Sequence, residues 1–252
     1  MFILSSIRTE LVNRFVRSRL GGLWMIINPL AQVLMYALIL SAILSAKLPG
    51  IDHRFAYAIY LTAGILAWTM FSEVVGRCLT MFIDNANLLK KLVFPRICLP
   101  AVITGSALLN AVLLFLAVCL VFGVLGHFPN VHFVWLPLLF LLNLTLALGL
   151  GLALGVLNVF VRDVGQITQL ALQYGFWFTP IVYMPAIIPE QLRFLLMFNP
   201  MYWIVVGYQN VLVFSAPPPA GGLIAVGLLA LLLILFSLFI FRRAAAEMVD
   251  VL

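Results

Sequence analysis

The feature that most constrains this chain is a very long stretch without formal charge, because residues 97–161 contain no Asp, Glu, Lys or Arg. An α-helix rises about 1.5 Å per residue, so about 20 apolar residues cross the roughly 30 Å hydrocarbon core of a bilayer. The stretch is therefore too long for one span, and glycines, a proline and an asparagine divide it at 123–132. We predict membrane-spanning helices near 97–122 and 133–160. The second carries Gly151-x-x-x-Gly155, a spacing that lets helices approach closely.

The composition extends this prediction to the whole chain of 252 residues. The chain is 65% hydrophobic and 9% charged, whereas soluble domains carry about 25% charged residues. Apolar stretches at 20–46, 55–82 and 220–241 predict three more spans, and the helix after the polar loop 161–166 predicts another. We expect an all-α membrane protein with six transmembrane helices.

Residues 1–20 are amphipathic rather than uniformly apolar. Ile7, Leu11 and Phe15 recur at helical spacing, while charged and amide side chains take the opposite face. A basic amphipathic helix is expected to lie in the headgroup layer, although a plain positively charged anchor explains the residues equally well. We therefore treat 1–20 as an interface helix and 21–252 as the transmembrane domain.

The basic residues predict a topology. When both termini are placed in the cytoplasm, all but three of the 14 Lys and Arg residues fall on that side. The exceptions are Lys47, Arg54 and Arg193. Such a bias is the positive-inside rule, and it places the loops 84–96 and 161–166 in the cytoplasm. It also accounts for the net charge of +6, so we expect no nucleic-acid partner.

The loop 84–96 combines charge with an amphipathic helix. Asp84 has the side chain of a helix N-cap, and Pro95 ends the helix because it lacks an N–H group. The two faces are formed by apolar Leu88, Leu89, Leu92 and Val93 and by polar Asn87, Lys90 and Lys91. This pattern predicts a docking surface for a cytoplasmic partner, although an ordinary basic loop gives the same pattern.

The fifth predicted span carries a strip of amide side chains. Gln166, Gln169 and Gln173 recur at helical spacing, and Trp177 continues the same face one turn later. Such a strip is unfavourable against lipid. It faces either neighbouring helices or a water-accessible path, and the residues leave both open.

Four prolines interrupt the next stretch, 178–208, which is too apolar for a free loop. A proline removes a backbone donor and breaks a helix. We predict a re-entrant or interfacial pair of short helices near 183–208, buried in protein where their free backbone groups find partners.

Few residues suggest chemistry. A carboxylate within a span, here Glu73, is a functional candidate, but Arg77 one turn later favours a structural clamp. The chain has no P-loop, HExxH or GxSxG motif, and its three cysteines form no CxxC pair. We expect no catalytic residue, no metal site and no cofactor bound by this chain itself.

Five blocks of sequence carry a resemblance to one family. They are RSRLGGLWMIINPL at 17–30, NLLKKLVFPR at 87–96, VRDV at 161–164, FWFTPIVY at 176–183 and FNPMY at 198–202. In order, spacing and span layout, they resemble the permease subunits of ABC-2-type exporters, in the branch that exports O-antigen, capsule and teichoic-acid polysaccharides. The resemblance covers nearly the whole chain.

The resemblance implies a homodimer in the bacterial inner membrane, surrounded by membrane lipid and joined by two P-loop ATPase subunits that bind ATP and Mg²⁺. It implies a lipid-linked glycan as cargo and re-entrant helices on the periplasmic side. A permease for small hydrophobic drugs or another lipid is the alternative, and a membrane-embedded enzyme is a third class. The residues implied in ATPase coupling are Asn85, Asn87, Leu88, Lys90, Lys91, Leu92 and Phe94, with Arg162 and Asp163 in a smaller contact.

A glycan channel needs aromatic rings and amides rather than fixed charges, because ring faces match the C–H faces of sugars. On the second span, the candidates for lining it are Trp68 and Phe71. The fifth span offers the stronger group, which is Gln166, Gln169, Gln173, Tyr174 and Trp177. For the aromatic residues, packing or contact with lipid is the alternative.

Overall fold

The computed structural model describes residues 23, 24, 27, 30, 31, 56–91, 98–124, 130–245, 247 and 248. The predicted interface helix 1–20, most of the first span 20–46, and Leu92 and Phe94 of the loop 84–96 lie outside these residues. Within the described part of the chain the structure is helical and has no strand, in agreement with the all-α prediction.

Among the described residues, four helices are long and apolar enough to cross a membrane. They are α3 (Ala56–Asp84), α5 (Cys98–Val124), α6 (Leu136–Phe160) and α10 (Ala220–Ala244). All four coincide with predicted spans. The 3₁₀ helix η2 (Val131–Trp135) leads directly into α6, so the apolar segment there begins at Val131.

α7 (Asp163–Phe178), which corresponds to the fifth predicted span, is shorter. It has 16 residues, which rise about 24 Å. It ends because the ring of Pro180 disfavours helical dihedrals in the residue before it, and Thr179 is accordingly extended, with φ −96° and ψ 135°. Among the described residues, four of the predicted spans are therefore helices of membrane-crossing length, and the fifth predicted span is shorter.

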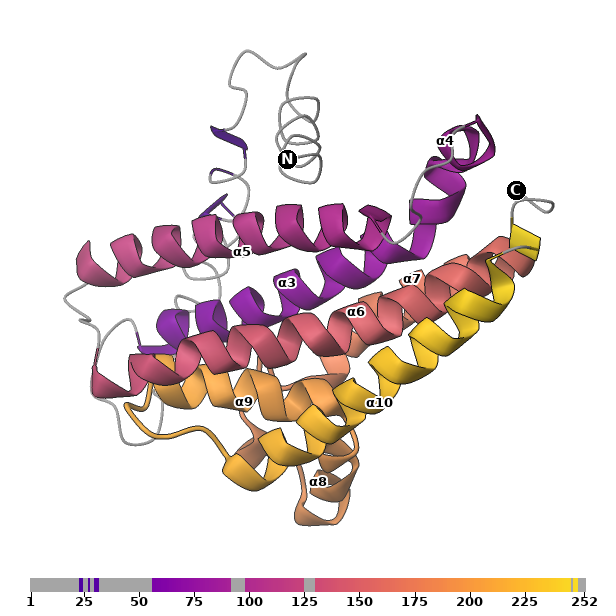
Figure 1. Ribbon diagram of the computed structural model, residues 1–252. Coiled ribbons are helices and arrows are strands. Elements are labelled where there is room, and N and C mark those ends of the chain that lie inside the picture. The colour runs from indigo at the N-terminus through magenta and orange to yellow at the C-terminus, as the bar shows by residue number, and fades with distance from the viewer. Residues whose placement is uncertain are drawn as a thin grey trace.

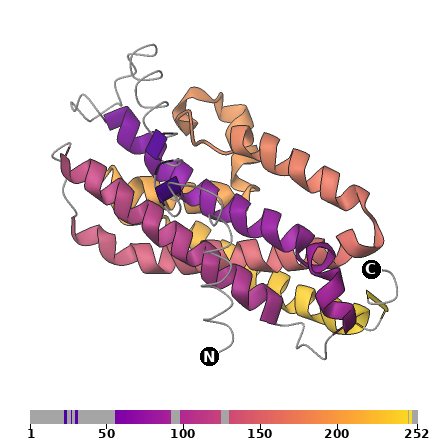
Figure 2. The ribbon, with the colours of Figure 1, turned by 90° about the horizontal axis from the view of Figure 1, so that it is seen from above.

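α3 and α6 lie side by side and run parallel. Asn143 Nδ2 donates to the carbonyl of Ala67 at 2.8 Å, and fifteen residues further along α6 Asn158 Nδ2 donates to the carbonyl of Leu79 at 2.9 Å. α10 runs in the same direction, and Figure 1 shows α3, α6 and α10 all ending on the side of the C-terminus. In Figure 2, α5 and α7 lie on opposite sides of α3.

The glycines of α6 make this close contact possible. A methyl group added to Gly151 would lie 2.8 Å from Cβ of Cys78, and one added to Gly155 would collide with the Cys78 carbonyl oxygen. Gly149 meets α10 in the same way, at Leu233. The predicted small-residue motif is therefore a contact surface for two helices.

The prolines break the segment after α7 as predicted. It forms η3 (Pro185–Ile187), α8 (Glu190–Met197) and α9 (Pro200–Leu212). Asn199 caps α9, because its Oδ1 accepts from the backbone N–H of Met201 at 3.0 Å,. α9 is buried against α3 and α6, whereas most of α8 is exposed at the lower edge of Figure 1.

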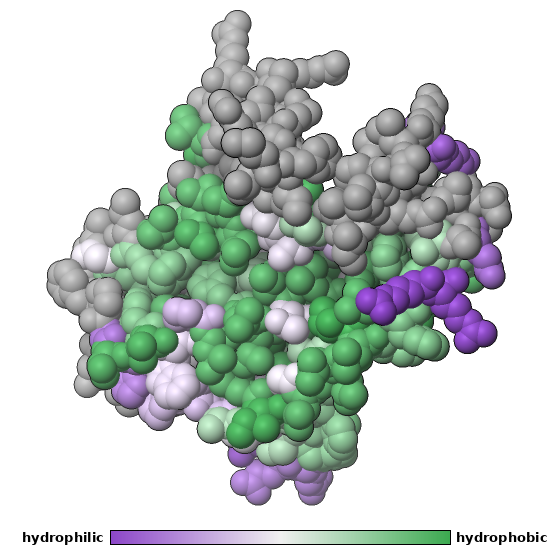
Figure 3. Space-filling model, in the orientation of Figure 1, coloured by the Kyte–Doolittle hydropathy of each residue, from purple (hydrophilic) through white to green (hydrophobic). Residues whose placement is uncertain are grey.

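The outer surface is apolar. On α10, only 22% of the most apolar window is buried. Its exposed side chains include Leu228, Leu232, Leu235 and Phe239. Figure 3 shows a largely hydrophobic face, with hydrophilic residues where α4 (Ala86–Lys91) and α10 end and at the lower edge of the view, by α8. An apolar surface of this extent marks a membrane or protein interface, and together with the four helices of membrane-crossing length it identifies a multi-pass membrane protein.

Candidate functional site

One end of the molecule collects the predicted ATPase-coupling residues. α3 and α6 run parallel, so Asp84 and Phe160 end at the same side, where α4 and the start of α7 also lie (Figure 1). Of the coupling residues, Asn87 and Lys90 are exposed and Asn85 is half-buried. Leu88 and Lys91 lie in α4, whereas Leu92 and Phe94 lie outside the described residues.

The joint between α3 and α4 is a single residue. Asp84 is the last residue of α3, so the prediction that it caps a new helix is wrong. Instead, the backbone N–H and the side-chain Nδ2 of Asn85 both donate to the carbonyl of Met81, at 3.2 and 2.8 Å. Asn85 thus fastens the start of α4 to the last turn of α3.

Arg162 and Asp163 lie in the turn between α6 and α7, and both are exposed. Asp163 is the first residue of α7 rather than its cap, because Arg162 already has helical dihedrals. A carboxylate in the first turn still stabilises the helix through its dipole. The turn packs closely on α6, since a methyl group on Gly165 would lie 2.8 Å from Oδ1 of Asn158, whose Nδ2 donates to the carbonyl of Leu79 in α3.

The amide strip is exposed along α7. Gln166, Gln169 and Gln173 are exposed on α7, as are Tyr174 (58%) and Trp177 (61%). Thr168 is the one residue of α7 that is buried. The strip was predicted to face either neighbouring helices or a water-accessible path. Among the described residues no helix covers it, so packing against neighbouring helices is not observed.

An aromatic row connects the two predicted channel groups. Trp68 of α3 packs against Phe71 and Phe176, with ring centroids 5.7 and 6.0 Å apart, and Phe176 packs against Trp177 at 5.6 Å. Phe71 is buried and Trp68 half-buried. The sequence interpretation missed Phe176, although its position beside Trp177 pointed to an aromatic cluster.

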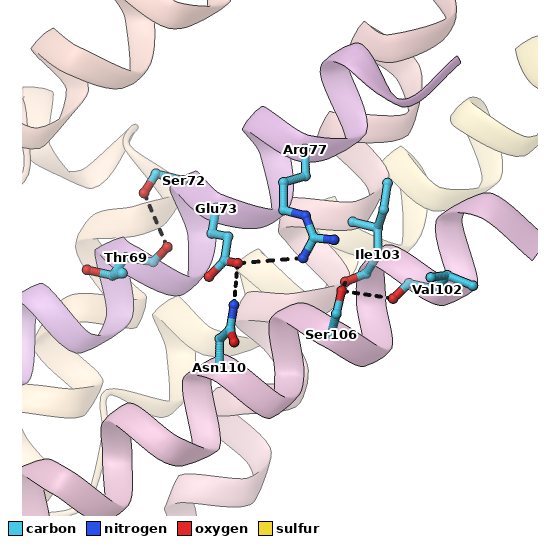
Figure 4. A network of polar contacts seen from close by, with 8 residues as sticks. All are labelled: Thr69, Ser72, Glu73, Arg77, Val102, Ile103, Ser106 and Asn110. Atoms are coloured by element: carbon cyan, nitrogen blue, oxygen red, sulfur yellow. Dashed lines mark hydrogen bonds and ion pairs between the residues drawn. The ribbon is translucent and has the colours of Figure 1, made fainter. Parts of the chain in front are cut away.

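The carboxylate of Glu73 forms a clamp between α3 and α5 (Figure 4). Its Oε1 lies 3.6 Å from Nη1 of Arg77 and accepts from Nδ2 of Asn110 at 2.6 Å. The Glu73–Arg77 pairing predicted from their spacing is present. Because the same oxygen also ties two helices together, the geometry is that of a structural contact.

A second polar cluster surrounds the turn 179–183, and the sequence did not predict it. Two tyrosines of α3 donate to backbone carbonyls of this turn: Tyr57 to Val182, and Tyr60 to Pro180 and Tyr183 at 3.3 and 3.1 Å. Gln209 of α9 also donates to the Pro180 carbonyl, at 3.0 Å. We call these three side chains and the turn they bind the turn cluster.

No group of metal-ligating side chains is present among the described residues, since no three His, Cys, Asp or Glu side chains gather there. The site therefore consists of a polar and basic end, an exposed amide and aromatic strip, and helices that join the two. Such an arrangement can bind and guide a polar molecule, and it offers one surface to a soluble partner.

Comparison with known proteins agrees with this geometry. The family described as ABC-2 type transporter matches residues 2–213. The O-antigen export system permease protein RfbA of Myxococcus xanthus is 30% identical over 251 residues, which are 98% of this chain and 94% of that protein. A protein of the same name from Klebsiella pneumoniae is 27% identical over 206 residues, which are 80% of this chain and 76% of that protein. With a match of this extent, the chain belongs to the ABC-2 type transporter family.

Proposed function

We propose that this chain is the transmembrane subunit of an ATP-driven exporter that moves a lipid-linked polysaccharide across the bacterial inner membrane. The observation that carries the proposal is the exposed amide and aromatic strip on α7, in a family member whose relatives are named O-antigen export permeases. The cargo passes through a channel between two copies of the chain, each of which contributes its strip.

The chemistry of the strip suits a sliding glycan. Amide groups exchange hydrogen bonds with hydroxyls without fixing a charge, and the faces of Tyr174 and Trp177 match the C–H faces of sugar rings. Fixed charges would hold the polymer in one register. Among the strip residues of α7, none carries a charge.

Energy comes from a separate subunit. The chain has no P-loop, so ATP and Mg²⁺ are bound by two ATPase partners that dock on α4 and, in a smaller contact, on Arg162 and Asp163. These residues support the proposal because they are at one end of the bundle, and Asn87, Lys90, Arg162 and Asp163 expose their side chains there.

The proposed topology has six spans with both termini in the cytoplasm. α7, continued by the turn 179–183, is the fifth span. α8 and α9 are the re-entrant helices on the periplasmic side, which is supported by the burial of α9 between α3 and α6. The amphipathic residues 1–20 lie at the interface near the ATPases.

The test is export by a strain in which this chain is replaced by the double variant Gln169→Leu and Gln173→Leu. Surface glycan is measured by lectin or antiserum, and the assembled complex by affinity purification with its ATPase. We expect export to fall about tenfold, as when about 1.4 kcal/mol of favourable contact is lost along the path, with assembly unchanged.

The control variant is Leu232→Ala, an exposed position on α10, which should export normally. Normal glycan export by the double variant would overturn the lining role of α7. Loss of ATP-dependent efflux of a small lipid or drug, with glycan export unaffected, would instead identify that other class of cargo.

A further inference from the structure

We infer that Tyr60 and Gln209 are positioning residues for transport, because they make the outer end of α7 move together with α3. This inference rests on the proposed function. It concerns side chains that touch neither the strip nor the coupling surface. The strip can move cargo only if α7 is displaced when an ATPase subunit displaces α4. The turn cluster provides the connection between the two.

α7 has few other attachments. Thr168 is its one buried residue. Leu172 and Phe176 pack partly buried against the core, and Phe176 lies against Trp68 of α3. α7 is thus held by one narrow face, and the turn cluster adds the attachment beyond its outer end.

The turn cluster is dense and buried. Tyr60, Ile181 and Gln209 are at most 2% exposed, and Thr179 is fully buried. The carbonyl of Pro180 receives two donors, Tyr60 Oη and Gln209 Nε2. Thr179 Oγ1 closes the end of α7 by donating to the carbonyl of Gly175 at 2.8 Å. Within a membrane, a carbonyl that lost these donors would find no water, so separation of the turn from α3 is costly.

α3 and the turn also approach closely enough to exclude sliding. A methyl group on Gly64 would lie 3.0 Å from Cγ2 of Ile181 and 3.3 Å from its Cα. Backbone of the turn therefore lies directly on α3. Because hydrogen bonds and close packing join α3 and the turn 179–183 at the same place, we infer that the two move as one body.

α3 carries this attachment to the other end of the molecule. It has 29 residues without a break, which rise about 43 Å, from the tyrosines at its start to Asn85 at its end. Asn85 fastens α4 to it. A displacement of α4 by an ATPase thus reaches the turn cluster through one continuous helix, and the turn cluster passes it to α7 and α9.

The first test removes donors without changing shape, in the variants Tyr60→Phe and Gln209→Leu. Purified complexes in proteoliposomes are assayed for ATP hydrolysis and for ATP-dependent transfer of a lipid-linked glycan. We expect transfer per ATP to fall about tenfold, which corresponds to about 1.4 kcal/mol of lost coupling, while hydrolysis per complex is retained. The matched control Tyr202→Phe, a hydroxyl deletion on α9 outside the turn cluster, should leave both rates unchanged.

The second test replaces the lost hydrogen bonds by a covalent bond. Cysteines are placed at positions 64 and 181, in a chain whose three native cysteines are alanine, because a Cβ at position 64 would lie 3.3 Å from the Cα of residue 181. In the Tyr60→Phe variant, oxidation of this pair should restore transfer per ATP, and reduction should remove the rescue. A purely structural role would lower complex yield instead and would not respond to oxidation.

The outcomes separate the inference from the function on which it rests. Complexes of the unaltered chain that transfer no glycan would overturn the proposed function and the inference with it. Active unaltered complexes, combined with unchanged transfer per ATP in both single variants, would overturn the inference alone. A 64–181 disulfide that stops transfer in an otherwise unaltered chain would also overturn the inference, because the turn and α3 would then have to separate during the transport cycle.

Discussion

α3 and α7 are neighbouring helices of the same bundle, but they differ in almost every physical respect. In α3, 78% of the most apolar window is buried, and the helix contacts α5, α6, α7 and α9. In α7, Thr168 is the one buried residue, and amides and aromatic rings are exposed along its length. One helix is built for stability, and the other is built to present its side chains.

The difference shows that packing and the presentation of polar side chains are carried by different helices of this bundle. A polar strip destabilises a helix that is covered by lipid, so the strip needs a partner or a water-filled path, and the helix that presents it needs support on its other face. α3 supplies that support through Trp68 and the turn cluster, and it also carries α4. Substitutions that disturb the packing of α3 should therefore affect folding, whereas substitutions in the strip, and loss of the donors of the turn cluster, should affect transport.

The largest expected effect comes from breaking the α3–α6 contact with Gly155→Leu. The new side chain meets the backbone carbonyl of Cys78, which cannot move without shifting α3. We expect a loss of about 3 kcal/mol and a collapse in the yield of monodisperse protein in detergent. Gly221→Leu is the control, because nothing lies within 4 Å of a methyl group there. Equal yields for the two variants would contradict this packing.

The opposite behaviour is expected from Trp177→Ala in α7. Its indole is 61% exposed, so its removal should leave the melting temperature of the purified complex unchanged. Transport should fall about fivefold, the factor that about 1 kcal/mol of aromatic contact supplies. Phe178→Ala is the matched control, because Phe178 is also exposed but points about 100° away from Trp177 around the helix. Equal transport by the two variants would remove the distinction between the strip and the rest of α7.

Much of the helical framework of the molecule could be predicted from the sequence. α3, α5, α6 and α10 follow from apolar length alone, because only a span buries about 20 such residues without charge. The breaks after α7 follow from Pro185, Pro189 and Pro200, which stand at or just before the starts of η3, α8 and α9. The strip follows from the spacing of its glutamines.

The tertiary contacts could not be predicted. Tyr60 and Pro180 are 120 residues apart, and an isolated tyrosine or glutamine in an apolar stretch does not indicate its partner. Phe176 was overlooked because its role depends on Trp68 of another helix. The assignment of Asp84 as a cap failed for a local reason. α3 runs on to Asp84 and α4 begins at Ala86, so the helix boundary lies one residue from the position that the sequence suggested.

The smallest expected effect comes from Glu73→Gln, which tests whether a polar contact of α3 serves packing or chemistry. The amide oxygen of the new side chain can still accept from Asn110 Nδ2, which now lies 2.6 Å from Glu73 Oε1. What is lost is the charge opposite Arg77 at 3.6 Å, a contact of about 0.5 kcal/mol. The melting temperature should fall by a few degrees at most, and glycan export should remain normal. Loss of export from a complex that assembles fully would indicate a chemical role for the Glu73 carboxylate. α3 would then do more than support α7.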